Sequence, residues 1–257
     1  GTNDWQKIEF VFKTGNDDSS ILSCLLGLDG PASGRAWFDD MSLELLRSEN
    51  FNTAVTIDVA DKKESMSEYI YGQFIEHLGR CIYGGIWAEM LEDRKFWYLP
   101  GDRESPWQVK GKRELFSVDR ANPFTGDKTP VLGVDGSGAA GIQQSGLGLK
   151  PDLEYEGRII LKATPGITAV KVTLSRGEES QSVTIDKLGT IFSAYPLKYQ
   201  SGAMTHNASL TIEPEGNGKV WVGTASLMPS DNIEGFRSDV IALLKELNAP
   251  VYRWPGG

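Results

Sequence analysis

Two short segments of the sequence each consist of an apolar run that ends in a charged side chain. Glu76 directly follows the apolar-rich residues 70–75, and Arg253 directly follows Val251 and Tyr252. A carboxylate at the end of a buried strand can accept hydrogen bonds from a polar ligand, and a guanidinium there favours ionised carboxylates and keeps their pKa low. These residue types are therefore typical of a ligand-binding cleft. The structural alternatives are a solvated or ion-paired Glu76 and a salt bridge at Arg253 that joins neighbouring strands.

The residues next to Glu76 and Arg253 also have both a structural and a ligand-binding interpretation. For His77 we favour a structural role, and for Trp254 we favour packing in a core over an aromatic wall for a ligand. Gly256 and Gly257 would let the backbone approach a ligand closely.

Glu89, Glu92 and Asp93 form an acidic cluster that resembles the paired carboxylates of a glycosidase. Retaining chemistry needs two carboxyl groups about 5 Å apart that face each other across a sugar. Neighbours on one helix face the same way, so we expect a solvated helical face here.

Nucleotide and metal sites are not predicted. Residues 136–141 match the dinucleotide fingerprint in letters, but the residues that follow are a poor helix in an all-β setting. His77 and His206 lie far apart and have no nearby cysteine, and Asp39-Asp40 is more typical of a turn than of a calcium site. We therefore expect no cofactor and no metal.

The cysteines and the net charge narrow the class of protein further. Cys24 and Cys81 are too few for a disulfide framework, and we expect both to be buried free thiols. A net charge of -9 argues against nucleic acid and anionic membranes, which require clustered Lys and Arg, and favours a neutral ligand. No apolar run approaches the roughly 20 residues that span a bilayer, and the chain starts without a charged and apolar leader.

Hydrophobic patterning predicts the elements that must position these residues. Strand-like runs occur at 8–13, 21–27, 35–45 and 52–60, and helical spacing of Trp87, Met90 and Leu91 predicts a short helix over 84–96. From 104 to 228 the pattern is that of a β-sandwich or jelly roll, with strands at 158–161, 170–174, 182–185, 209–212 and 219–222. An amphipathic helix over 235–248, capped by residues 230–232 and stopped by Asn248 and Pro250, then leads into the strand that carries Arg253.

This order places a whole β domain between the strand of residues 70–76 and the helix that returns to the next strand. We expect the domain to fold on its own and to stand beside the face where the two strands end. The sequence does not sort its aromatic residues into core and surface, namely Trp107, Tyr155, Tyr195, Tyr199 and Trp221.

The phrases Phe-x-Glu-His-Leu-Gly-Arg (74–80) and Arg-Trp-Pro-Gly-Gly (253–257) resemble the first two barrel strands of the α-L-arabinofuranosidases of glycoside hydrolase family 51. Residues 34–43 are similar to the last strand of jelly-roll carbohydrate-binding modules. The resemblance implies a multidomain β and α/β chain, with a jelly-roll sandwich inserted after the first strand of an incomplete (β/α)₈ TIM barrel. The implied domains are the end of a carbohydrate-binding jelly roll (1–48), a linker and a strand of a C-terminal sandwich (49–67), the first barrel strand and its loop (68–103), the insert (104–228), and the first barrel helix with the second strand (229–257).

The resemblance also implies a function. The chain is expected to be the N-terminal part of a retaining enzyme that removes terminal arabinofuranose from arabinan, arabinoxylan or related polysaccharides, and to act outside the cytoplasm. Glu76 is then a ligand of the sugar, Arg253 orients the catalytic carboxylates, and Trp254 and Gly257 complete the substrate site. Both catalytic glutamates would lie on later strands, so the chain alone is expected to be inactive. A non-catalytic carbohydrate-binding β protein is the alternative.

Overall fold

The computed structural model describes residues 4–15, 21–24, 33–47 and 54–256. The chain divides into two compact units, Gly1–Lys63 and Glu64–Gly257, and each is described by itself.

The described residues of the first unit contain no helix and no strand. The strands predicted at 8–13 and 35–45, and over the described part of 52–60, are therefore wrong, while 21–27 is described only as far as Cys24. Large apolar side chains such as those of Trp5 and Trp37 are 69% exposed, so these runs have no covering layer in the described residues. Cys24 is a free thiol as expected but is exposed rather than buried.

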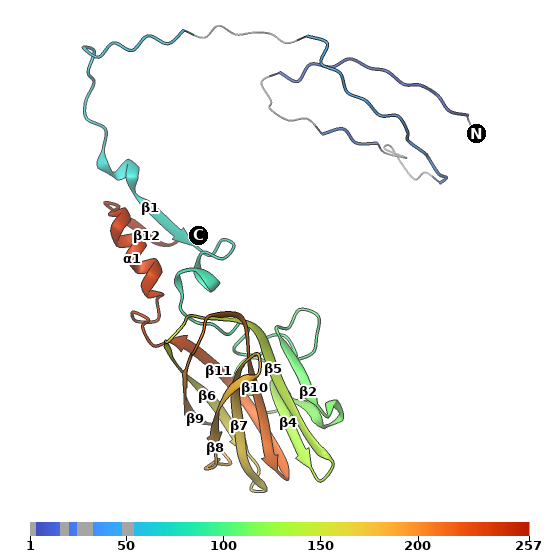
Figure 1. The fold of residues 1–257 in the computed structure, drawn as a ribbon, viewed down its shortest axis with the longest axis vertical. Helices are drawn as coiled ribbons and strands as arrows, with labels where there is room; N and C mark the ends of the chain where they lie inside the picture. Colours follow the sequence, from blue (N-terminus) through green and yellow to red (C-terminus); the bar gives the residue numbers. More distant parts are fainter. Residues whose placement is uncertain (1–3, 16–20, 25–32, 48–53, 257) are drawn as a thin grey trace. The chain divides into compact units, whose positions relative to one another are not determined.

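The second unit begins with a parallel pair of strands and the helix that connects them, which we call the strand–helix unit (Figure 1). The short 3₁₀ helix η1 (Glu68–Tyr71) precedes β1 (Gln73–Glu76), which pairs in parallel with β12 (Tyr252–Gly256). Helix α1 (Ser238–Leu247) returns the chain to β12 and ends at Asn248, whose backbone is left-handed. The predicted strand, helix and parallel strand are thus confirmed. Among the described residues, no third strand joins the β1–β12 sheet.

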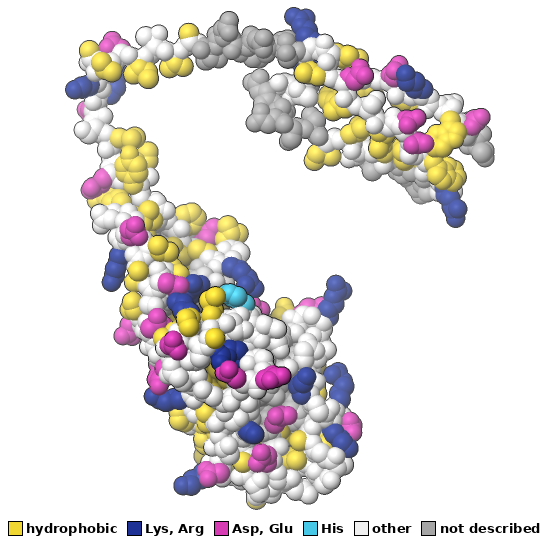
Figure 2. Space-filling model, in the orientation of Figure 1, with side chains coloured by type: hydrophobic (Ala, Val, Ile, Leu, Met, Phe, Trp, Pro, Cys, Tyr) yellow, Lys and Arg dark blue, Asp and Glu magenta, His cyan; other side chains and the backbone are white. Residues whose placement is uncertain are grey.

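Helix α1 begins later than predicted and buries only part of its apolar face. The predicted capping residues shape the turn before the helix instead: Ser238 Oγ donates to Asp231 Oδ2 at 2.7 Å. Ile241 and Leu244 line a groove with strand residues, whereas Leu247 is 56% exposed. Apolar side chains gather at the surface over η1 and β1 on the face drawn in Figure 2, whereas charged side chains are scattered over the sandwich surface there.

Residues 84–96 do not form the predicted helix. Ile82–Ile86 form a single π-type turn interrupted by Gly84, at φ +75°, and the chain then runs without helix along the edge of the sandwich. The backbone of this segment forms hydrogen bonds with residues far along the chain. Met90 N donates to Leu227 O at 3.0 Å, and Ala225 N donates to Arg94 O at 3.1 Å. We call residues 87–96 the strap.

The sandwich consists of two antiparallel layers, with orders β8-β7-β10-β5-β2 and β3-β4-β11-β6-β9, joined by the β4–β5 hairpin (Figure 1). All five strands predicted between 158 and 222 lie inside observed strands, so the sandwich is confirmed. The strands are β2 (Trp107–Gly111), β3 (Phe116–Asp119), β4 (Thr129–Asp135), β5 (Gly138–Leu149), β6 (Glu154–Ala163), β7 (Ile167–Arg176), β8 (Glu179–Ile185), β9 (Ser193–Gln200), β10 (Thr205–Gly216) and β11 (Gly218–Pro229), with the short helix η3 at Arg113–Leu115.

The segment that matches the dinucleotide fingerprint forms the turn of the β4–β5 hairpin. Val134 pairs with Ala139, and Ser137 donates to Asp135 Oδ1 from both its backbone N and its hydroxyl. A strand follows this turn, where a dinucleotide fold would require a helix.

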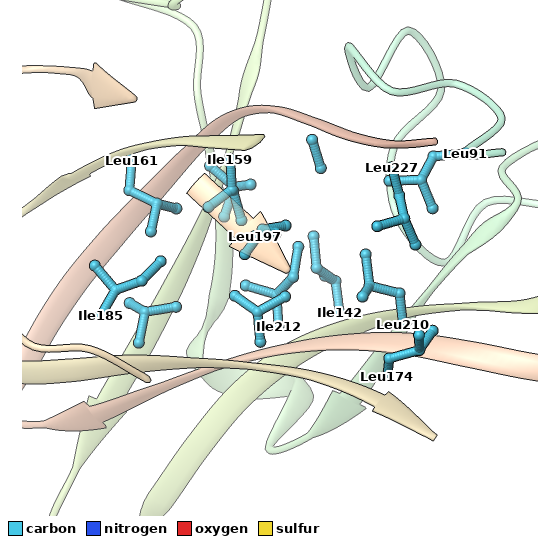
Figure 3. Close-up of a cluster of buried hydrophobic side chains, with 14 of the residues drawn as sticks. Leu91, Ile142, Ile159, Leu161, Leu174, Ile185, Leu197, Leu210, Ile212 and Leu227 are labelled. Carbon is cyan, nitrogen blue, oxygen red and sulfur yellow. The ribbon is translucent and has the colours of Figure 1, made fainter. Parts of the chain in front are cut away.

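The core lies between the two layers and draws in two side chains of the strap. Along β11, Val220, Val222, Ala225 and Leu227 face inward and are fully buried. Leu91, 4% exposed, lies beside Leu227 in this layer of side chains (Figure 3). Phe96, 1% exposed, packs against the fully buried Trp107, with the two rings tilted and their centres 5.4 Å apart. The core of the sandwich therefore includes residues that precede the boundary predicted at 104.

The structure sorts the aromatic residues that the sequence left unsorted. Trp107, Tyr155 and Tyr199 are buried in the core, while Tyr195 and Trp221 are half-buried. Burial raises the pKa of Tyr199, whose hydroxyl donates to Val172 O at 2.9 Å.

Candidate functional site

The two residues that the sequence singled out lie on adjacent parallel strands. Glu76 is the last residue of β1, whereas Arg253, which was expected to end its strand, is the second residue of β12, which continues to Gly256. Phe74 pairs with Arg253 and Glu76 pairs with Gly256 in the β1–β12 ladder. The Arg253 guanidinium lies 6.0 Å from the centre of the Phe74 ring. Glu76 is half-buried, and neither Glu76 nor Arg253 forms an ion pair or a side-chain hydrogen bond within the described part of the chain. Both charged groups are therefore available to a ligand or to further protein groups.

Side chains alternate along β12, so Arg253 and Trp254 point to opposite faces of the strand pair. Tyr252 and Trp254 line the groove against α1, which leaves Arg253 on the face away from the helix. Trp254 is 44% exposed and meets Phe236 edge to face at 5.9 Å, so its predicted place in a core is wrong. Gly257 lies outside the described residues.

A loop and a turn form the walls of a hollow beside these strand ends. Gly85 lies so close to the backbone of Arg80 that an added Cβ would stand 2.1 Å from Arg80 O, which makes glycine necessary in the π-type turn. The turn is bonded to the residues before α1, since Ala88 N donates to Gly235 O at 2.9 Å and Arg237 N donates to Ile86 O at 2.8 Å. These bonds place Trp87 directly opposite Phe236.

The resulting hollow, of about 270 Å³, is lined largely by rings, and we call it the ring-lined hollow. The Tyr83 ring lies 5.8 Å from His77 and 5.2 Å from Trp87, measured between ring centres. His77 is exposed, and the structural role that we favoured for it stays a prediction. The lining residues are His77, Ile82, Tyr83, Trp87, Glu234, Gly235, Phe236 and Trp254.

Glu89 holds the strap to the sandwich behind this hollow. Its side chain is 5% exposed and accepts hydrogen bonds from Ser226 Oγ at 2.6 Å and from the backbone N of Leu227 at 3.0 Å. It also pairs with Arg94 at 3.8 Å, and the Arg94 guanidinium lies 4.8 Å from the centre of the Trp87 ring. The solvated helical face predicted for Glu89 is therefore wrong, because a distant strand supplies the partners that bury its carboxylate.

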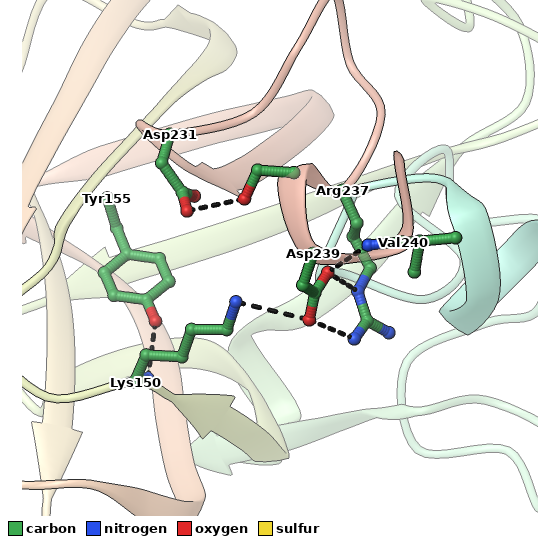
Figure 4. Close-up of polar contacts among 7 residues, drawn as sticks. Lys150, Tyr155, Asp231, Arg237, Asp239 and Val240 are labelled. Carbon is green, nitrogen blue, oxygen red and sulfur yellow. Dashed lines mark hydrogen bonds and ion pairs between the residues drawn. The ribbon is translucent and has the colours of Figure 1, made fainter. Parts of the chain in front are cut away.

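A second polar cluster fixes the start of α1 to the sandwich (Figure 4). Asp239 Oδ2 accepts from Arg237 Nη2 at 2.8 Å and from Lys150 Nζ, at the end of β5, at 3.3 Å. The hydrogen bond from Arg237, and secondarily the charges of Arg237 and Lys150, lower the pKa of Asp239 well below its usual range. The strand–helix unit is thus attached to the sandwich through α1 as well as through the strap.

The outer face of the sandwich carries one aromatic cluster. Lys162 Nζ lies 4.5 Å from the centre of the Trp221 ring and 4.7 Å from that of Phe192, and Trp221 Nε1 donates to Asp119 Oδ2 at 2.9 Å. A hydrogen bond from Asn122 N, followed by the one from Trp221, lowers the pKa of Asp119. The ammonium of Lys162 therefore lies over the faces of both rings.

Sequence reasoning missed the residues that line the ring-lined hollow other than His77 and Trp254. Trp87 and Phe236 are assigned there to predicted helices, and Tyr83 and Glu234 are not considered. The usable signal is the phrase Tyr-Gly-Gly-Ile-Trp (83–87), in which two glycines separate two aromatic residues and disfavour a helix. Cys81, expected to be buried, is an exposed free thiol.

Comparison with known proteins relates the chain to one class of enzyme. α-L-Arabinofuranosidase 1 of Arabidopsis thaliana is 25% identical over 267 residues, which cover 92% of this chain and 38% of the relative. An extracellular exo-α-L-arabinofuranosidase of Streptomyces chartreusis is 25% identical over 79% of this chain and 26% of its own length, and an intracellular one of Bacteroides ovatus is 55% identical over 37 residues, 14% of this chain and 7% of its own length. The chain is thus distantly related to α-L-arabinofuranosidases and spans well under half the length of these relatives.

No protein-family model matches the chain. Among solved structures, the carbohydrate-binding module TmCBM61 in complex with β-1,4-galactotriose aligns with a TM-score of 0.42 and 17% identity, over 55% of this chain and 99% of the module. No helix among the described residues is both long and apolar enough to cross a membrane.

Proposed function

We propose that this chain is the N-terminal part of a retaining α-L-arabinofuranosidase of glycoside hydrolase family 51, and that β1, α1 and β12 belong to its (β/α)₈ barrel. The observation that carries the proposal is the parallel pairing of β1 with β12, which brings Glu76, at the carboxyl end of β1, and Arg253 onto neighbouring strands in a chain related to arabinofuranosidases over 92% of its length. Active sites of such barrels lie at the carboxyl ends of the strands.

In this proposal Glu76 and Arg253 act as substrate-site residues and not as the catalytic pair. Glu76 accepts hydrogen bonds from hydroxyl groups of the arabinofuranose, and the Arg253 fork meets the catalytic carboxylates and keeps them ionised. The nucleophile and the acid/base are glutamates on later strands, facing each other about 5 Å apart across the sugar. The substrate is a polysaccharide or oligosaccharide with terminal arabinofuranose.

The exposed apolar surface of the strand–helix unit also supports this proposal. Phe74 is 57% exposed, and Leu243, on α1, is 64% exposed. Further strands and helices of a barrel would bury these side chains, which gains about 25 cal/mol for each Å² removed from water.

The test uses the longer protein that contains this chain. We expect it to hydrolyse an aryl α-L-arabinofuranoside with retention of anomeric configuration, followed by NMR, whereas residues 1–257 alone show no turnover. Glu76→Gln should lower kcat/KM roughly ten- to hundredfold by weakening a charge-assisted hydrogen bond. The matched control is Glu68→Gln, in the exposed first turn of η1.

Binding of arabinan without hydrolysis by the longer protein would replace this proposal with the non-catalytic carbohydrate-binding protein. Export from the cytoplasm is part of the proposal. Since one relative is named extracellular and another intracellular, fractionation of the source cells decides the compartment.

A further inference from the structure

The ring-lined hollow lies beside the strand ends but is lined by neither Glu76 nor Arg253. Its walls combine aromatic rings with a single carboxylate, that of Glu234, and with the imidazole of His77. Mostly apolar walls with a few polar groups are typical of small-molecule sites. We infer that the ring-lined hollow binds one neutral sugar ring of the polysaccharide, next to the arabinofuranose held at Glu76. This inference rests on the proposed function and names a second subsite within it.

The rings are held in place by the protein itself. The Trp87 backbone is bridged to Phe236, and its indole contacts the Arg94 guanidinium, which does not line the hollow and therefore lies behind the ring. Arg94 is in turn paired with the buried Glu89, which the sandwich holds through Ser226. A wall that is fixed before the ligand arrives loses little conformational entropy on binding.

Glu234 has a strained backbone that points to a role in this hollow. Its φ is +52°, and with Gly235 at φ +86° it forms a two-residue turn closed by hydrogen bonds in both directions between Ile233 and Phe236. Turns of this kind favour Asn or Gly at the first position, so a glutamate there is disfavoured by its own backbone. Its carboxylate has no hydrogen bond or ion pair within the described residues, and it is free to accept from sugar hydroxyl groups.

Size and charge define the ligand class. A volume of about 270 Å³ is slightly below the usual range of about 300–1,000 Å³ for small-molecule pockets, which suits a single sugar ring. The apolar face of a sugar packs on aromatic rings, while its hydroxyl groups reach Glu234 and His77. The carboxylate of Glu234 and the net charge of -9 disfavour sugars that carry an acid.

Ligand-detected NMR titration of residues 1–257 tests the inference with three probes: α-1,5-arabinotriose, xylotriose and trigalacturonate. We expect a neutral trisaccharide to bind with a dissociation constant on the order of 1 mM. Tyr83→Ala should raise this constant about three- to tenfold. The matched control Tyr69→Ala removes a tyrosine of similar exposure, 65% against 61%, that does not line the hollow, and it should leave the constant within about twofold. Glu234→Gln should weaken the binding of the neutral probe and strengthen the binding of trigalacturonate.

Failure of both neutral probes to bind, equal effects of Tyr83→Ala and Tyr69→Ala, or tighter binding of trigalacturonate by the unaltered chain would each overturn the inference. None of these measurements depends on turnover. If the longer protein hydrolyses the substrate but residues 1–257 bind no trisaccharide, the inference of a second subsite is wrong and the proposed function stands. Binding without hydrolysis by the longer protein removes the proposed function.

Discussion

The sandwich and the strand–helix unit belong to one compact unit of the chain but differ in how they bury their apolar residues. The sandwich encloses Leu210 and Ile212 completely between its two layers, whereas the strand–helix unit leaves Leu243 and Leu247 of α1 largely in solvent. Among the residues that the structure describes, the strand pair has no third strand and no full covering layer, which a small sheet needs for stability of its own. The sandwich is therefore a finished core, and the strand–helix unit depends on its attachments to the sandwich and, in our proposal, on further barrel elements.

The largest expected effect comes from the choice of residues at which an isolated sandwich domain begins and ends. A segment of residues 104–228 lacks Leu91 and Phe96, while a segment of residues 87–231 retains them. Loss of a buried side chain of this size lowers the free energy of unfolding by about 2–5 kcal/mol, and a typical domain has a total of about 5–15 kcal/mol. We expect a cooperative thermal transition by circular dichroism only for the longer segment. Equal melting temperatures for the two would mean that the strap adds nothing to the sandwich.

The next prediction compares one leucine from each region of residues 1–257 by urea denaturation. Leu210→Ala should lower the free energy of unfolding by about 2–5 kcal/mol, because the side chain is fully buried. Leu247→Ala, at a site 56% exposed, should change it by no more than about 0.5 kcal/mol. In the longer protein Leu247→Ala should become costly, since barrel elements would cover it. Similar losses for the two variants of residues 1–257 would remove the contrast between the regions.

Glu89 tests the connection between the two regions. Glu89→Gln should lower the free energy of unfolding by about 1–3 kcal/mol, because it weakens the hydrogen bonds that the buried carboxylate accepts. Faster hydrogen exchange at the amides of Leu91 and Leu227, which both donate to Glu89 Oε1, is the specific readout. Glu92→Gln is the matched control. Because the ion pair between Glu92 and Arg80 is exposed, losing it should lower the free energy of unfolding by less than about 0.5 kcal/mol. Unchanged exchange at both amides would contradict the role of Glu89.

The smallest effect is the pH dependence of the attachment at α1. Because the folded state lowers the pKa of Asp239 below its ordinary value of 3.8, its stabilising contribution is complete above that value and is lost as pH falls below it. The carboxylate is 39% exposed, so solvent screening limits the effect to about 1 kcal/mol or less. Asp239→Asn should flatten this part of the acid profile of unfolding, and Asp186→Asn, at an exposed site, should leave it unchanged. An identical acid profile for Asp239→Asn would show that the cluster adds no stability.

Several elements were predictable from the sequence because their signal is local. Alternation of apolar and polar residues identified the sandwich strands. The spacing of Val240, Leu244 and Leu247 with the stop at Asn248 identified α1. The order of strand, helix and strand indicated that β1 and β12 are parallel neighbours. Glu76 and Arg253 were found by their place after apolar runs, which the chain itself displays.

The tertiary structure alone decided which groups meet across long stretches of chain. The spacing of Trp87, Met90 and Leu91 fits a helix, yet the backbone of this segment bonds to Leu227 and Gly235, about 140 residues further along the chain. The same distant strand buries Glu89, which by its charge alone belongs in water. Periodicity reports which side chains share a face but not what that face packs against. The ring-lined hollow depends on such long-range contacts, because a loop before the sandwich and a turn after it supply its opposite walls.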